Sequence, residues 1–234
     1  MTLTICILAK DGVVIASDSR ASSTLTSNDT VKKIFKLEDH IAVGIAGDGP
    51  LATHLFDLIL PKLNYRTGIT DIAEQLRKEC KEKFNEYFDH LKPEDRPSLS
   101  ILLAGYSQTN NPEIYFLRSN DNFVPRKSPT GFECIGIPYI AEYLLNRIYG
   151  KEITVSQATT MAAFCIKETG SQDYRVGGPT QIATFSNSKA YSELSRLEID
   201  TIEKNCESLL KGYKANFYPE DTTGPSSSED ATKS

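Results

Sequence analysis

The first fifty residues carry the hydrophobic pattern of short β-strands. Residues 2–9 and 13–19 are rich in β-branched and aliphatic side chains, and Asp11–Gly12 between them favours a tight hairpin turn. Residues 32–47 indicate a second pair of strands that turns at Glu38–Asp39. We therefore expect four short, mostly antiparallel strands, and no helix, in this part of the chain.

After Pro50 the apolar residues recur at helical spacing. The pattern predicts two helices and then three strands, at 51–61, 70–90, 99–106, 113–119 and 131–137. It then predicts two helices, a strand and a final amphipathic helix, at about 137–149, 155–169, 180–187 and 189–211. The second of these helices is expected to start at Thr154/Ser156 and to stop at Gly170.

This order groups strands with strands and helices with helices. Such clustering favours antiparallel sheets flanked by helices, a layered α+β sandwich, over an alternating α/β fold. A nucleotide-binding fold is not supported, because the glycine clusters Gly44–Gly49 and Val176–Gly178 lack a P-loop lysine and no GxGxxG follows a strand. We expect a single domain over residues 1–217 and a disordered polar tail over 218–234.

Composition narrows the setting in which this domain works. The chain has 234 residues, of which 39% are hydrophobic, and a net charge of −5. These values suit a globular domain and provide no basic field for nucleic acid. No apolar run reaches the roughly 20 residues that a membrane helix needs, and the N-terminus lacks the features of a signal peptide. The five cysteines are scattered, which is typical of reduced cysteines in a cytosol-like compartment. We therefore expect a cytoplasmic protein with no membrane or nucleic-acid partner.

Residue spacing gives no support to metal or cofactor chemistry. The three histidines, His40, His54 and His90, lie far apart in the sequence and lack the spacing of zinc ligands. The nucleophile motif GxSxG and the zinc motif HExxH are both absent. We therefore expect no metal and no cofactor. Cys6 has no histidine near it in the sequence, so we interpret it as a core-facing or pocket-lining residue.

The start of the chain offers a different kind of chemistry. Thr2 is small enough for the initiator Met1 to be removed, which exposes threonine as the first residue of a strand. A terminal threonine carries a hydroxyl and an α-amine whose ordinary pKa is about 7.7–8.0. The amine is therefore able to act as the base for the hydroxyl of the same residue. Taken alone this signal is weak, because many proteins begin with Met-Thr.

Longer stretches around Thr2 strengthen the signal. The segments TLTICILAKDGVVIASDSRAS, KKIF and IAVGIAGDG resemble the opening of a proteasome β-type subunit. The resemblance continues in GIPYIAEYLL at 136–145 and DYRVGG at 173–178, and it covers roughly residues 2–200. It implies a four-layer αββα sandwich of two antiparallel sheets flanked by helices, the N-terminal-nucleophile hydrolase fold. Arg20, in the DSR triplet, is expected to brace the hairpin.

The resemblance implies a role for five residues. Thr2 is the implied nucleophile, and its free amine is the proton acceptor. Lys33 is the nearby cation that stabilises the alkoxide and keeps the amine unprotonated at neutral pH, and Asp18 holds the lysine head group in place. Gly47 matches the glycine whose N–H forms the oxyanion hole. Asp173 matches an acid that supports the terminal amine.

Simpler interpretations exist for the same residues. Asp18 and Lys33 could form a solvated ion pair worth under about 1 kcal/mol, and Gly47 could serve a tight turn. The sequence also departs from the family at two positions, because catalytic members usually carry serines where this chain has Ile137 and Val176. Apolar side chains cannot relay a proton, so the proton network around Thr2 is expected to be thin.

Three classes of function therefore stay open. The first is a threonine-type endopeptidase that cleaves peptides or polypeptides with Thr2, after loss of Met1, inside homo-oligomeric rings or a related stacked assembly. The second is a non-catalytic structural subunit of such an assembly. The third is a hydrolase of small amides that shares the N-terminal-nucleophile architecture. The first and third classes need a free terminal amine, and the second does not.

Overall fold

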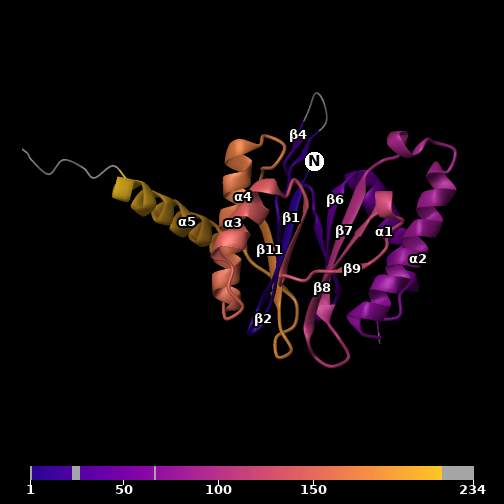
Figure 1. The fold of residues 1–234 in the computed structure, drawn as a ribbon, viewed down its shortest axis with the longest axis horizontal. Coiled ribbons are helices and arrows are strands. Elements are labelled where there is room, and N and C mark those ends of the chain that lie inside the picture. The colour runs from indigo at the N-terminus through magenta and orange to yellow at the C-terminus, as the bar shows by residue number, and fades with distance from the viewer. Residues whose placement is uncertain (1, 23–26, 66, 218–234) are drawn as a thin grey trace, which may run out of the picture.

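The structure is a computed structural model that describes residues 2–22, 27–65 and 67–217. Two features expected from the sequence, the removal of Met1 and the polar tail over 218–234, lie outside the described residues. Figure 1 shows the described chain as a layered sandwich, with two sheets in the middle and helices on both outer sides.

Two five-stranded antiparallel sheets form the centre of the molecule. The first has the order β10-β1-β2-β11-β12, and the second has the order β5-β6-β7-β8-β9. The strands of the first sheet are β1 (Leu3–Ala9), β2 (Gly12–Ser17), β10 (Phe132–Gly136), β11 (Gln181–Phe185) and β12 (Ser192–Glu193). Those of the second are β5 (Ile34–Glu38), β6 (Ile41–Gly47), β7 (Leu99–Tyr106), β8 (Pro112–Arg118) and β9 (Arg126–Lys127). A small ribbon of β3 (Ala21–Ser22) and β4 (Ser27–Asn28) stands apart from both.

Five helices complete the layers. The second sheet is covered by α1 (Gly49–Ile59) and α2 (Ile69–Phe88), and the first by α3 (Tyr139–Ile148) and α4 (Val155–Gln172). The last helix, α5 (Arg196–Phe217), begins against α4 and then extends away from the body (Figure 1). The α+β sandwich of antiparallel sheets flanked by helices, expected from the sequence, is confirmed.

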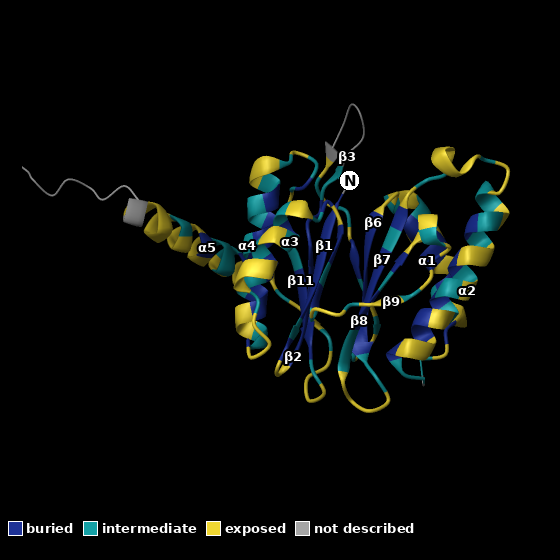
Figure 2. Ribbon diagram, viewed as in Figure 1, coloured by how far each residue is buried: buried dark blue, intermediate teal, exposed yellow. Residues whose placement is uncertain are grey.

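The core has three apolar layers because each sheet is buried on both faces (Figure 2). In β1, Leu3, Ile5 and Ile7 face the layer under α3 and α4, while Cys6 faces the layer between the sheets. Successive side chains of a strand point to opposite faces, so this strand needs apolar residues at nearly every position. That requirement explains why its sequence shows only a faint alternation.

The sequence-based elements differ from the structure in several places, among them a last helix that runs to Phe217 instead of 211 and a short strand, β9, that was not expected. The last helix does not begin at 189, because residues 192–193 pair with β11 as β12. The helix begins at Arg196, directly after a reciprocal cap between Ser195 and Glu198. The α4 helix passes through Gly170 to Gln172, and the missing side chain leaves room for the carbonyl of Val176, 3.2 Å from a built Cβ. The β3–β4 ribbon was not expected at all. The capped start at Thr154 is confirmed.

Gly44 sets how closely the two sheets approach beside β1. A Cβ built there would lie 2.5 Å from the Thr4 methyl group and 3.2 Å from Ile15. Thr4 cannot easily move aside, because its hydroxyl bonds to Ser17 and to the carbonyl of Ile45. Gly44→Ala should therefore lower the free energy of unfolding by about 1–3 kcal/mol, measured by urea denaturation. Gly49→Ala is the control, since a Cβ there meets no atom within 4 Å; an equal loss in both variants would contradict this account.

Candidate active site

The carboxylate of Asp18 is the centre of a buried hydrogen-bond network. Asp18 follows β2 directly, and its residue is fully buried. One oxygen, Oδ1, accepts from the backbone N–H of Leu3 at 3.0 Å and from Lys33 Nζ at 2.8 Å. The other, Oδ2, accepts from the N–H of Gly177 at 3.0 Å and of Arg20 at 3.2 Å. The carboxylate therefore joins the start of β1 to two segments that lie far from it in the sequence.

Lys33 is the cation of this network. It stands directly before β5, and only 3% of its side chain is exposed. Its ammonium donates to Asp18 and, at 2.5 Å, to the carbonyl oxygen of Arg20. Burial lowers the pKa of Lys33, and the negative charge of Asp18 opposes that shift. The interpretation of Asp18 and Lys33 as a solvated surface pair is therefore wrong.

Thr2 lies beside this pair. Leu3 N and Lys33 Nζ bond to the same oxygen, which places the two nitrogens within about 6 Å of each other. Thr2 itself is 5% exposed, and its carbonyl accepts from the N–H of Ile137 at 2.9 Å. Within the described chain no hydrogen bond joins Lys33 Nζ to the Thr2 hydroxyl, so the link between them passes through Asp18 and the backbone of Leu3.

Two glycines with positive φ angles, Gly47 and Gly136, line the same cleft as Thr2. Gly136, at φ +93°, ends β10, and a Cβ there would lie 1.9 Å from the carbonyl oxygen of Thr2. Gly47, at φ +116°, ends β6, and a Cβ there would lie 2.1 Å from the carbonyl oxygen of Ser98. Neither position accepts a side chain without displacing backbone. Gly47 thus has the structural role of a close backbone approach, whatever else it does.

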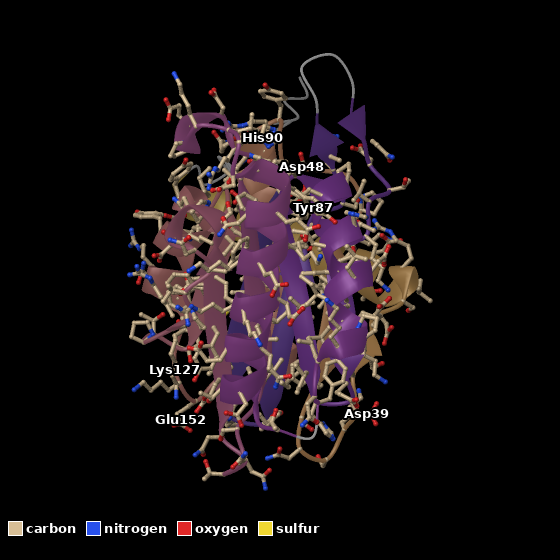
Figure 3. The ribbon with its side chains drawn as sticks, turned by 90° about the vertical axis from the view of Figure 1, so that its right-hand side faces the viewer. Asp39, Asp48, Tyr87, His90, Lys127 and Glu152 are labelled. Atoms are coloured by element: carbon tan, nitrogen blue, oxygen red, sulfur yellow. The ribbon has the colours of Figure 1, made fainter. Side chains whose placement is uncertain are left out.

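Thr2, Gly47 and Gly136 line one cleft, with a volume of about 600 Å³. The cleft lies between the ends of β6, β7 and β8 on one side and the end of β10 on the other. Asp48, another lining residue, lies near the upper end of the sandwich in Figure 3, far from Asp39 at the opposite end. The N-terminus lies at that same upper end in Figure 1. Thr2, the nucleophile predicted from the sequence, therefore lines a cleft at this end of the molecule.

Comparison with known proteins gives the family. The sequence profile of the family described as "Proteasome subunit" matches residues 2–185. This chain belongs to the proteasome subunit family. It is 30% identical to the proteasome subunit beta of Methanothermobacter thermautotrophicus over 211 residues, which cover 89% of this chain and 95% of that protein. It is also 28% identical to the proteasome subunit alpha type-3 of Saccharomyces cerevisiae, covering 92% of this chain and 76% of that one.

Solved structures support the same fold. Anbu, an ancestral beta-subunit, from Yersinia bercovieri superposes with a TM-score of 0.76 at 16% identity, covering 96% of this chain and 100% of that one. A Gly-1 mutant of Anbu from Hyphomicrobium superposes with a TM-score of 0.74 at 14% identity, with the same coverage. At such low identity the likeness establishes the fold of the proteasome subunit family and leaves activity to be argued from the site.

Asp173 has a clear partner in the structure. It ends α4, and its carboxylate accepts from Arg175 Nη2 at 2.6 Å and from Arg175 Nε at 2.9 Å. These hydrogen bonds hold the pKa of Asp173 below its ordinary value. The turn that follows reaches the site through Gly177, whose N–H bonds to Asp18. The role of Asp173 toward the terminal amine of this proteasome-family chain stays a prediction.

Sequence reasoning missed Gln181, which holds Lys33 in place. The side chain of Gln181 accepts from the N–H of Lys33 at 3.1 Å and donates to the carbonyl of Val31 at 2.7 Å. A polar residue at the start of an otherwise apolar strand was the available signal. Arg20 was expected to brace the hairpin of β1 and β2, but its guanidinium makes two hydrogen bonds to Asp29 and one to the carbonyl of Tyr174, so it joins the segment after β4 to the turn after α4.

The described residues give little support to a cysteine nucleophile, a metal site or a membrane-spanning helix. All five cysteines are free and buried, and burial raises the pKa of the Cys6 thiol well above its ordinary value, so Cys6 is a poor nucleophile. Over the described ranges no cluster of His, Cys, Asp and Glu has the arrangement of a metal site. Over the same ranges no helix combines the length and apolar character needed to cross a membrane.

Removing the charge of Asp18 should expose how much the buried lysine depends on it. Asp18→Asn leaves the Lys33 ammonium without its counter-ion, and we expect a loss of about 3–5 kcal/mol in the free energy of unfolding at pH 7. The pKa of Lys33 then falls further below its value in the unfolded chain, so the unfolded state binds more protons between those two values. The loss should therefore shrink as pH rises toward the ordinary lysine pKa.

Urea denaturation from pH 7 to 10 measures this dependence. Asp29→Asn is the matched control, because Asp29 pairs with Arg20 at a partly exposed site, and its loss should be much smaller and should not shrink with pH in that range. A deficit of Asp18→Asn that is independent of pH would show that Lys33 is not the group affected.

Proposed function

We propose that this chain is a threonine-type endopeptidase that uses Thr2 as nucleophile after Met1 is removed. One observation carries the proposal: a single oxygen of Asp18 accepts from both Leu3 N and Lys33 Nζ. This arrangement holds a buried cation next to the first residue of β1. The cleft shared by Thr2 and Gly47 supplies room for an extended peptide.

The proposed chemistry starts with proton transfer from the Thr2 hydroxyl to the terminal amine of the same residue. The hydroxyl oxygen then attacks the carbonyl carbon of the scissile peptide bond, and the carbonyl oxygen becomes an oxyanion beside the Gly47 N–H. Collapse of this intermediate breaks the C–N bond, and the leaving amine takes the proton from the terminal ammonium. Water then hydrolyses the resulting ester, which returns the free hydroxyl.

Lys33 tunes this chemistry by its charge. A nearby cation disfavours a second positive charge, so the ammonium lowers the pKa of the terminal amine and keeps it a base at neutral pH. The same charge stabilises the threonine alkoxide as it forms. Because Asp18 and the carbonyl of Arg20 hold the ammonium, its position does not have to be organised during the reaction.

We also propose the setting in which the reaction takes place. Subunits of this family assemble into oligomeric rings, and we place this chain in a homo-oligomer of that kind, acting on peptides or polypeptides. Its five cysteines are free and buried, which suits the reducing conditions of the cytoplasm.

A specific observation favours a second candidate, a non-catalytic subunit. Ile137 and Val176, which stand where catalytic relatives usually carry serines, are 2% and 1% exposed and belong to the apolar layer under α3 and α4. They cannot hydrogen-bond to the terminal amine. The family matches also include alpha subunits. A chain that assembles but hydrolyses nothing would fit this candidate.

Thr2→Ala and Lys33→Ala should each lower the hydrolysis of fluorogenic peptides by more than about 1,000-fold. The losses should not add in the double variant, because the two residues serve the same transition state. Lys32→Ala is the matched control: Lys32 precedes Lys33 but is exposed and pairs with Glu193, so its variant should keep full activity.

Two further measurements decide between the candidates. Intact-mass analysis of the wild type should show that the chain begins at Thr2 with a free amine, and a retained Met1 would end the peptidase proposal. Sedimentation of all variants should show unchanged assembly. Assembly without hydrolysis of peptides or small amides by the wild type would favour the non-catalytic subunit.

The pH profile of kcat/KM should have two limbs. Activity should rise with pH as the terminal amine loses its proton, with a midpoint at or below about 7.7–8.0 because Lys33 lowers that pKa. It should fall again as Lys33 loses its own proton, at a pH below the ordinary lysine value, because burial lowers the pKa of Lys33. Circular dichroism at each pH serves as the control for unfolding. A rate that keeps rising past the ordinary lysine pKa would contradict the role of the cation.

A further inference from the structure

The cleft that holds Thr2 also contains a cation that sequence analysis did not single out. Arg118 is the last residue of β8 and pairs in register with Ser100 of β7, and both line the cleft. The other charged residue of the lining is Asp48. The two differ in whether the protein already uses their charge.

Asp48 is occupied. Its side chain caps α1 and accepts from the N–H of Leu51 at 2.9 Å. The side chain of Arg118, in contrast, donates no hydrogen bond to, and forms no ion pair with, any residue in the described parts of the chain. Its guanidinium carbon lies 4.9 Å from the centre of the Phe116 ring. Stacking of this kind steadies the side chain and leaves its N–H groups available.

The charge of Arg118 lowers the pKa of a nearby carboxyl group, that of Glu133, although the two side chains form no ion pair. Burial, together with the charge of Glu142, raises the pKa of Glu133 on β10 of the other sheet, and Arg118 opposes that shift. No ion pair joins Arg118 and Glu133 among the residues described. The guanidinium thus presents a planar fork of five donors to the cleft, and carboxylates match that fork in two parallel hydrogen bonds.

We propose that Arg118 is a specificity-determining residue that binds a carboxylate of the substrate close to the scissile bond. The inference rests on the proposed function, because it takes Thr2 as the point of cleavage. A sphere with the volume of this cleft would be about 10 Å across, and an extended chain advances about 3.3–3.6 Å per residue. The carboxylate therefore belongs to a residue within about three positions of the cleaved bond. It is either an acidic side chain or the C-terminal carboxylate of a short peptide.

Matched substrates separate these two sources. Internally quenched peptides that carry one glutamate, moved through the positions on both sides of the cleaved bond, are compared with peptides carrying glutamine there. We expect kcat/KM to be about 10–100-fold higher with glutamate at one position, as for a charge-assisted hydrogen bond. A second pair of short peptides, with a free or an amidated C-terminus, tests the terminal carboxylate in the same way.

Variants then assign the preference to the guanidinium. Arg118→Gln should bring the preferred ratio close to one by raising KM for the acidic peptide, with little change for a neutral peptide. Arg118→Lys should keep part of the preference, because lysine retains the charge and loses the fork. Arg126→Gln is the control, since Arg126 is exposed on β9 and pairs with Asp121 outside the cleft. Full preference in Arg118→Gln would overturn the proposal.

A binding measurement separates this proposal from the peptidase proposal. Fluorescein-labelled peptides with one glutamate or one glutamine are titrated into the assembled Thr2→Ala variant, with and without Arg118→Gln, and anisotropy is measured. Tighter binding of the glutamate peptide that depends on Arg118 supports the carboxylate site even if the wild type hydrolyses nothing. Equal binding of the two peptides would overturn the site, while hydrolysis of a neutral peptide would leave the peptidase proposal standing.

Discussion

The buried Asp18–Lys33 pair is the constraint around which this end of the molecule is organised. Taking an ammonium out of water costs several kcal/mol unless a counter-ion and further hydrogen bonds replace the lost hydration. Asp18 supplies the counter-ion, and its oxygens accept four N–H donors from four different residues. The start of β1, the lysine and the Gly177 turn must all be in place before the charges are satisfied. Burying the cation thus fixes the position of Thr2.

Close packing between backbones supports that network. Gly44 brings β6 against Thr4, Gly136 brings β10 against the carbonyl of Thr2, and Gly47 brings β6 against Ser98. At each place a Cβ would lie closer than about 3 Å to another atom, so the approach depends on glycine. Gly44 thus allows the two sheets to approach each other beside β1, while Gly136 and Gly47 bring neighbouring segments of a single sheet together where the cleft lies.

Family membership and activity depend on different parts of the chain. Dozens of buried apolar residues set the two antiparallel sheets and their covering helices, and the chain matches both alpha and beta subunits over most of its length. The proposed hydrolysis depends on a few groups around Thr2. This chain has the buried cation and its counter-ion, while Ile137 and Val176 belong to the apolar core. The proposed reaction therefore relies on the terminal amine without the serine hydroxyls that catalytic relatives usually carry at these two positions.

The features that could be predicted from the sequence depend mainly on interactions between residues a few positions apart. The Asp11–Gly12 turn, the cap at Thr154 and the strand and helix periods depend on neighbours within a few positions, and the structure agrees with them. Thr2, Asp18 and Lys33 were recognisable because they lie in one stretch that resembles a family. Gly177, Gln181 and Arg118 reach the same end of the sandwich from more than 80 residues away. No local pattern encodes their meeting, because strand pairing and the burial of one charge decide it.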